Sequence, residues 1–191
     1  MQVFTPKMQL AIRFMMKTHE VYQKQKRKGK DIPYISHPLT VGLILARAGA
    51  SEDVIIAGIL HDTIEDSVAH KKVSREMLGE RFGATVAELV ESVTEVSKSV
   101  PWDERKREAL DHIDTFSNNS VLVKSADIIA NNAETLEDHA VGGDVVFERF
   151  SEPKEKTVGH SLRVIEKLLA KWPESPLAAD LAGMAERLSA L

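Results

Sequence analysis

The chain has 191 residues, a length that suits a single domain. Hydrophobic residues make up 43% and charged residues 28%, as in soluble globular proteins, and the net charge of −4 argues against a general nucleic-acid binder. Cysteine is absent, which excludes disulfides, zinc–thiolate sites and thiol nucleophiles.

The N-terminal segment has the composition of a helix and not of a targeting signal. Basic residues interrupt Met1–Lys17, and it has no continuous apolar core, so we expect no signal peptide. No apolar stretch of the chain has the length of a membrane span. We therefore expect a soluble cytoplasmic protein that does not bind membranes.

The first half of the chain alternates predicted helices with a basic loop. Apolar residues at helical spacing predict a helix from about Pro6 to Tyr22. Glycine and prolines make 24–38 a loop, and Pro38 suits the first turn of a helix that stops near Gly49. Ser51 can cap the next helix, whose residues up to Ile64 are apolar nearly all round. We expect that helix to be buried at the centre of the fold.

The second half continues the helical pattern, without the period-two alternation of strands. The predicted elements are a short helix capped by Ser74 and ending near Gly83, a helix over 84–98, a helix opened by Pro101 and broken at 118–120, a helix over 121–139, a turn at 142–143, a long helix up to Lys171, and a C-terminal helix over 175–191.

These elements predict an all-α fold of roughly eight to ten helices. We expect one domain over 1–191, with a core at about 6–170. The helix at 175–191 can pack on its own domain or on a neighbouring molecule, so the oligomeric state stays open.

Four polar residues occupy or end apolar segments: His37, His61, Asp62 and Asp127. An unpartnered polar group is costly in such a place, and a divalent metal is a partner that would satisfy all four. Two imidazoles and two carboxylates suit manganese, iron, zinc or magnesium-like ions. The alternatives are ordinary: the His-Asp pair can be a core hydrogen bond or a surface turn, His37 a helix N-terminal residue, and Asp127 a cap or buried acceptor.

Two more carboxylates follow the His-Asp pair. On a helix, Glu65 stacks over His61 and Asp66 over Asp62, four residues apart. Crowded carboxylates repel one another unless a cation lies among them. With a bound metal activating a water, Glu65 or Asp66 can orient that water or take its proton. A polar helix end that opens into the following loop is the alternative.

A basic segment precedes His37. Lys24, Lys26, Arg27, Lys28 and Lys30 can approach the same site and hold a polyphosphate, although a solvated basic loop has the same composition.

Several motifs in order resemble one known family. They are Gln25–Pro38, Leu60–Asp66, Arg81–Gly83 and Lys124–Asp127, and the resemblance extends from about Ala11 to Leu169. Together they resemble the HD hydrolase domain of the RelA/SpoT family, in its stand-alone branch of small alarmone hydrolases, which includes the metazoan SpoT homologs.

The resemblance implies an all-α HD fold with one manganese ion. It implies His37, His61, Asp62 and Asp127 as metal ligands, and Glu65 and Asp66 as the catalytic pair. Substrate would contact Arg27 and Lys28. The implied reaction removes the 3′-pyrophosphate from guanosine tetra- or pentaphosphate, so the expected partner is a small nucleotide and not a nucleic acid.

The chain departs from this family after Asp127. Asn131 is kept and can hydrogen-bond near the metal or the substrate, but the family's basic residues are replaced by Ile128 and Ala133, and its ring residue by Ala130. Two other hypotheses therefore stand beside alarmone hydrolysis. One is an HD hydrolase for another nucleotide or NADPH, and the other is a scaffold that binds nucleotide or protein without turnover.

Overall fold

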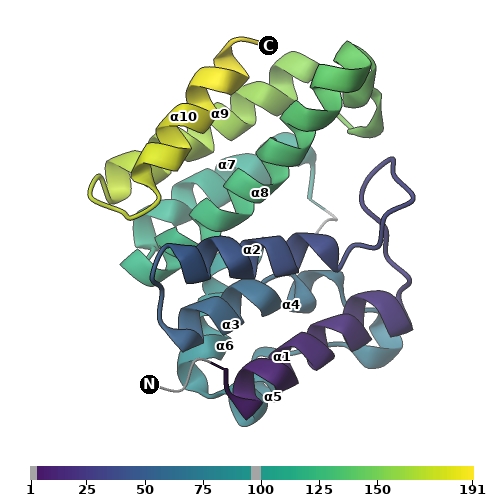
Figure 1. Ribbon diagram of the computed structural model, residues 1–191, viewed down its shortest axis with the longest axis vertical. Coiled ribbons are helices and arrows are strands. Elements are labelled where there is room, and N and C mark those ends of the chain that lie inside the picture. Colours follow the sequence, from purple (N-terminus) through teal and green to yellow (C-terminus); the bar gives the residue numbers. More distant parts are fainter. Residues whose placement is uncertain (1–3, 96–99) are drawn as a thin grey trace. The chain divides into compact units, whose positions relative to one another are not determined.

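The structure is a computed structural model that describes residues 4–95 and 100–191. Within these residues the regular elements are helices, and the only β-type pairing is an isolated bridge between Lys26 and Pro33. The predicted all-α class is confirmed. The chain divides into two compact units, Met1–Glu95 and Val96–Leu191, which are described separately (Figure 1).

The first unit holds the helices labelled α1 to α6 in Figure 1. Their bounds are α1 Pro6–Met16, α2 Ser36–Arg47, α3 Glu52–Leu60, α4 Thr63–Asp66, α5 Arg75–Phe82 and α6 Ala84–Val93, with a π-helix at Lys17–Tyr22 and a 3₁₀ turn at Ala69–Lys71.

Helix α3 is the centre of this unit, as its apolar sequence predicts. It packs against α1, α2 and α6, and most of its side chains are buried. Glycines allow the close approach of α2 and α3. A Cβ atom added at Gly58 would lie 2.3 Å from Leu45 Cδ1, and one added at Gly42 would lie 2.8 Å from Ile59 Cγ1. The position of α3 against α2 therefore depends on these two glycines.

The predicted first helix changes its geometry before it ends. The α-helical part stops at Met16, and Lys17–Tyr22 forms a π-helix, an irregularity that is often found at functional sites. His19 lies on this π-helix with none of its surface exposed. The wider turn therefore carries a titratable side chain into the interior of the unit.

The second unit contains α7 Trp102–His112, α8 Asn118–Gly142, α9 Lys154–Lys171 and α10 Ala178–Ser189, with 3₁₀ turns at Ile113–Thr115 and Gly143–Arg149. Helix α8 packs against α9 and α10, and α10 also packs against α9. Of the two placements open for the C-terminal helix, the structure shows packing on its own unit.

Several predicted boundaries were wrong, by three to about ten residues. Helix α8 begins at Asn118 because Ser117 caps it by accepting from the Ser120 N–H, so 118–120 starts a helix instead of breaking one. The long helix expected after Gly143 begins only at Lys154, beyond a 3₁₀ turn and Pro153. Helix α6 ends at Val93, so residues 94–95 of its predicted span are not helical, and 96–98 lie outside the described residues.

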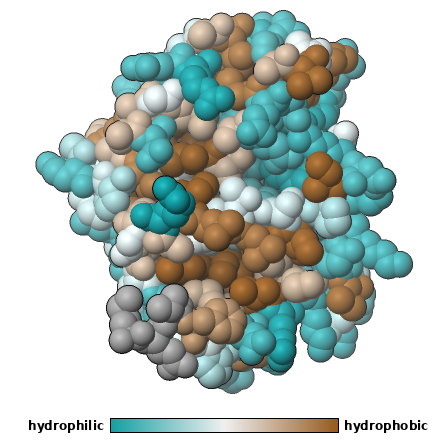
Figure 2. All heavy atoms as spheres, in the orientation of Figure 1, coloured by the Kyte–Doolittle hydropathy of each residue, from teal (hydrophilic) through white to brown (hydrophobic). Residues whose placement is uncertain are grey.

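Among the described helices, none combines the length and the apolar character that a membrane span requires. Large apolar side chains such as Val21 and Leu43 are exposed in the first unit, and Figure 2 shows hydrophobic residues among hydrophilic ones on the face drawn. The expectation of a single domain over 1–191 stays a prediction.

Candidate metal centre

His61 and Asp62 lie where the central helix is interrupted. We expected the helix to continue through this pair, but α3 ends at Leu60 and α4 begins at Thr63. Side chains at the break form hydrogen bonds with backbone carbonyl groups in the last turn of α3. His61 Nδ1 lies 2.7 Å from the Gly58 oxygen, and the Thr63 hydroxyl donates to the Leu60 oxygen over 2.7 Å. His61 keeps helical backbone angles, with φ of −54° and ψ of −36°, whereas Asp62 departs from them, with φ of −92° and ψ of −2°.

The contact with Gly58 fixes the tautomer of His61. A carbonyl oxygen only accepts hydrogen bonds, so Nδ1 of the buried ring carries a proton and donates it to Gly58. In the neutral ring Nε2 then presents a lone pair. Such an orienting hydrogen bond on one ring nitrogen is typical of histidines that bind a metal through the other.

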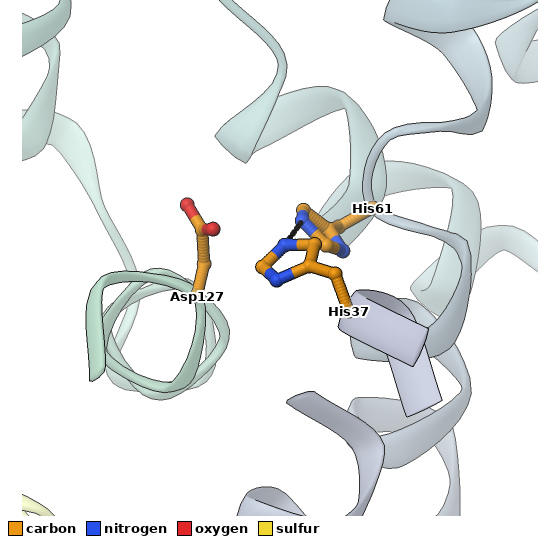
Figure 3. A group of neighbouring side chains, drawn as sticks. All are labelled: His37, His61 and Asp127. Carbon is orange, nitrogen blue, oxygen red and sulfur yellow. Dashed lines mark hydrogen bonds between the residues drawn. The ribbon is translucent and has the colours of Figure 1, made fainter. Parts of the chain in front are cut away.

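Two further possible metal-ligand atoms lie close to that nitrogen. His61 Nε2 lies 3.3 Å from His37 Nε2 and 3.0 Å from Asp62 Oδ2, and the two outer atoms are 3.8 Å apart. Figure 3 shows the rings of His37 and His61 turned toward one another, with His37 carried by α2. Both histidines are buried.

The spacing of the three atoms fits a single metal ion. Ligand atoms about 2.1 Å from one ion lie roughly 3 to 3.5 Å from each other, and the observed separations match this range or exceed it slightly. If His61 is neutral, its lone pair faces the Asp62 oxygen at 3.0 Å, and a metal ion between the two atoms would relieve their repulsion. The donor set of imidazole nitrogen and carboxylate oxygen suits a divalent metal.

Tyr34 supports this site, and sequence reasoning did not single it out. Its hydroxyl donates a hydrogen bond to Asp62 Oδ2, and its ring lies 5.7 Å from the His37 ring and 5.0 Å from the His19 ring. In the sequence, the only indication that Tyr34 belongs to the site is its position three residues before His37. Its partner Asp62 is 28 residues away, so only the fold reveals the contact.

The two carboxylates expected to act in catalysis lie on α4, directly after the proposed ligands. The Asp66 N–H donates to the Asp62 carbonyl oxygen over 2.9 Å, which keeps the predicted one-turn relation between these residues. Asp66 Oδ2 accepts a hydrogen bond of 2.8 Å from Gln25 Nε2. Glu65 is half-buried beside it.

The basic loop approaches the site through Arg27. The Arg27 guanidinium lies over the Tyr34 ring at 5.5 Å, while Lys28 is exposed. Lys26 instead forms an ion pair with Asp31 in the same loop. Of the two predicted substrate contacts, Arg27 therefore packs on Tyr34, a residue that also hydrogen-bonds to Asp62.

Asp127 and Asn131 belong to the second unit, on consecutive turns of α8. Asp127 is buried, and both of its oxygens accept hydrogen bonds: Oδ2 from Lys124 at 2.9 Å and Oδ1 from Asn131 at 2.6 Å. Figure 3 shows its carboxylate projecting from α8. Asn131, predicted to act near the metal or the substrate, thus orients Asp127 within its own helix.

The departures from the family pattern lie on the same helix. Ile128 and Ala130 are buried, and Ala133 is half-buried. None of these side chains offers a charge or a ring to a ligand.

Comparisons with known proteins identify the HD domain in this chain. The HD-domain family model matches residues 11–136. The guanosine-3′,5′-bis(diphosphate) 3′-pyrophosphohydrolase MESH1 of Danio rerio is 41% identical over 115 residues, which are 59% of this chain and 61% of that protein. MESH1 of Xenopus tropicalis is 39% identical over 59% of this chain and 62% of its own length. The match therefore spans about three fifths of these relatives.

Two solved structures share the fold. A structure described as a metazoan ortholog of SpoT that hydrolyses ppGpp has a TM-score of 0.81 and 24% identity, with 100% of both chains covered. A crystal structure from Listeria monocytogenes EGD-e has a TM-score of 0.70 and 27% identity, and covers 80% of this chain and 96% of that one. The resemblance predicted from the sequence is confirmed by the family model, these relatives and this fold.

Proposed function

Since this chain belongs to the HD-domain family, we propose that it is a divalent-metal phosphohydrolase that removes the 3′-pyrophosphate from guanosine tetra- or pentaphosphate. One observation carries the chemistry. His37 Nε2, His61 Nε2 and Asp62 Oδ2 converge within 3.8 Å, and the Gly58 carbonyl keeps the His61 proton on the opposite nitrogen. The names of the MESH1 relatives support the choice of substrate.

The proposed metal is one manganese ion. We assign His37, His61 and Asp62 as its ligands from the first unit, and the buried Asp127 carboxylate as the ligand from the second. Imidazole and carboxylate donors suit manganese, and the absence of cysteine removes the thiolates that favour softer metals. When bound, such an ion supplies a water whose pKa is lowered toward neutrality.

The chain's own carboxylates would handle the proton. Asp66, held through Oδ2 by Gln25, and its neighbour Glu65 would orient the attacking water and accept its proton. The water oxygen would bond to phosphorus as the bond from phosphorus to the ribose 3′ oxygen breaks, and that oxygen would leave with a proton as a hydroxyl. Arg27 and Lys28 would bind the phosphates of the substrate and offset charge in the transition state. Asn131 would act by orienting Asp127.

A second substrate class has an observation in its favour. Ile128 and Ala130 are buried and apolar where the family that the chain resembles has a basic residue and a ring. A pocket wall without these groups would favour another nucleotide, or NADPH, over the guanosine alarmones. A scaffold without turnover explains less, because binding alone gives no reason to keep Glu65 and Asp66 directly after these converging donor atoms.

The test is a turnover assay with manganese on a panel of guanosine tetraphosphate, guanosine pentaphosphate, nucleoside triphosphates and NADPH, following release of pyrophosphate and phosphate. We expect pyrophosphate from the alarmones. Faster turnover of NADPH or another nucleotide would contradict the proposed substrate but support the proposed metal-dependent hydrolysis. No turnover of any of them would contradict both enzyme hypotheses.

A paired variant tests the site. Asp62→Asn should abolish turnover and lower the stoichiometry of bound manganese from one to near zero, measured by calorimetry. The control Asp180→Asn removes the same charge from an exposed residue of α10, and it should keep the wild-type turnover and the wild-type stoichiometry of bound manganese. Full activity in Asp62→Asn would overturn the assignment.

A further inference from the structure

A chain of hydrogen bonds connects the buried π-helix with the proposed catalytic carboxylate. His19 Nδ1 lies 2.8 Å from Gln25 Oε1, and Gln25 Nε2 donates to Asp66 Oδ2 over 2.8 Å. The three residues come from the π-helix, the basic loop and the end of α4, all within the first unit. Residues far apart in the sequence are thus joined at the carboxylate that is proposed to take a proton.

The backbone of Gln25 is held on both sides. Its N–H donates to the His19 carbonyl oxygen over 2.9 Å, and its carbonyl accepts from the Tyr34 N–H over 2.8 Å. Lys24, just before it, adopts a left-handed conformation with φ of 49°, which is uncommon for a residue with a side chain. The loop therefore fixes the point from which the Gln25 side chain extends.

The direction of each hydrogen bond follows from Asp66. An ionised carboxylate only accepts, so the Gln25 NH₂ group must face Asp66 and its carbonyl oxygen must face His19. That oxygen also only accepts, so His19 must carry its proton on Nδ1. Both hydrogen bonds therefore form with only one tautomer of His19 and only one orientation of the Gln25 amide.

Burying the His19 ring is energetically unfavourable, and this cost indicates that the histidine has a specific role. Its ring is fully buried, and Nε2 has no hydrogen-bond partner among the described residues. An aromatic or aliphatic side chain would fill this space without an unsatisfied nitrogen. Burial lowers the pKa of His19, and the hydrogen bond with Gln25 opposes this only in part, so the neutral ring is favoured. Donation to Gln25 is what a histidine adds at this position.

We propose that Gln25 is a positioning residue that holds Asp66 for proton transfer, and that the Nδ1–H group of His19 fixes the orientation of the Gln25 amide. The inference rests on the proposed function, in which Asp66 is catalytic. Gln25 acts on Oδ2 of Asp66 and so limits rotation of the carboxylate. Its loss should lower kcat and leave KM nearly unchanged, because substrate binding does not depend on that rotation.

The kinetic test uses variants that separate the two hydrogen bonds. Gln25→Leu removes both and should reduce kcat about 10- to 100-fold with KM within about threefold. Gln25→Glu keeps an acceptor for His19 but cannot donate to Asp66, so its kcat should fall as much as that of Gln25→Leu. His19→Phe should lose less, and His19→Gln, which restores a donor, should recover most of the activity. The control Gln9→Leu, exposed on α1, should match the wild type.

A second measurement needs no turnover. Long-range ¹H–¹⁵N correlation spectra of protein labelled at histidine should show His19 protonated on Nδ1 alone, and Gln25→Leu should abolish this preference. A His19 ring protonated on Nε2 would overturn the proposal, as would an active wild type with unchanged kcat in folded Gln25→Leu and Gln25→Glu. If the wild type turns over nothing, the proposed function fails, while the spectra still decide the role of His19.

Discussion

The Nδ1 atom of His61 donates a hydrogen bond of 2.7 Å to the carbonyl oxygen of Gly58, three residues before it. The same glycine is the point where α3 meets α2, because a Cβ atom there would lie 2.3 Å from Leu45 Cδ1 and 3.2 Å from Val41 Cγ1. Packing of the first unit and orientation of the proposed ligand thus depend on one residue.

Gly58→Ala should therefore affect stability and metal binding together. Alanine gains about 1 kcal/mol of helix propensity over glycine, but overpacking a core costs about 1–3 kcal/mol, and the fully buried Leu45 has little room to move. We expect a net decrease in the free energy of unfolding in urea, and weaker binding of manganese. Gly183→Ala is the control, since a Cβ atom there meets nothing within 4 Å, and it should stabilise the protein. Equal stabilisation by both substitutions would contradict this packing.

Removing the hydroxyl of Tyr34 should weaken the metal site without unfolding it. Tyr34→Phe keeps the ring contacts with His19 and His37 but loses the hydrogen bond to Asp62. Loss of such an outer partner typically costs 10- to 100-fold in metal affinity or activity, and we expect about this loss in a manganese titration. Tyr22→Phe, at an exposed tyrosine, should bind like the wild type. Unchanged affinity in Tyr34→Phe would show that Asp62 needs no such support.

Arg27 should contribute to substrate binding more than to turnover. Arg27→Met keeps much of the side chain over Tyr34 but removes the charge that would meet phosphate. We expect KM for guanosine tetraphosphate to rise about tenfold, with a smaller change in kcat. Arg47→Met, exposed at the end of α2, should leave KM unchanged. A loss confined to kcat would instead place Arg27 at the reacting phosphate.

Stability should fall on acidification because of His19. Burial lowers its pKa in the folded protein below the ordinary value of 6.5, which the unfolded chain keeps. Below about pH 6.5 the unfolded state therefore binds more protons at this residue, and the free energy of unfolding decreases as the pH decreases. His19→Phe removes this contribution, so its unfolding free energy should fall less than that of the wild type between pH 7.5 and 5.5. His70→Phe, at an exposed histidine, should keep the wild-type fall. Equal falls in the wild type and His19→Phe would contradict the assignment.

Local sequence signals predicted most of the helices. Ser74 caps α5 as expected, by accepting from the Met77 N–H, and the apolar stretch before His61 is buried. The interruption at His61 and Asp62 was not predictable from apolar spacing, because side-chain hydrogen bonds to the Gly58 and Leu60 carbonyls produce it.

The residues around the proposed ligands were harder to foresee than the ligands themselves. His37 and His61 were predicted as ligands because polar groups in apolar segments need partners. Gln25 and Tyr34 are ordinary loop residues in the sequence, and their roles depend on contacts with Asp66 and Asp62 that only the tertiary fold creates. The resemblance covered the motif that contains them without assigning them a function.

The most direct test of the metal centre is anomalous diffraction at the manganese edge from crystals grown with Mn²⁺. We predict one peak within about 2.3 Å of His37 Nε2, His61 Nε2 and Asp62 Oδ2, with a carboxylate oxygen of Asp127 completing the set. A map with no peak between the two histidines, at manganese concentrations that support turnover, would contradict the proposed centre.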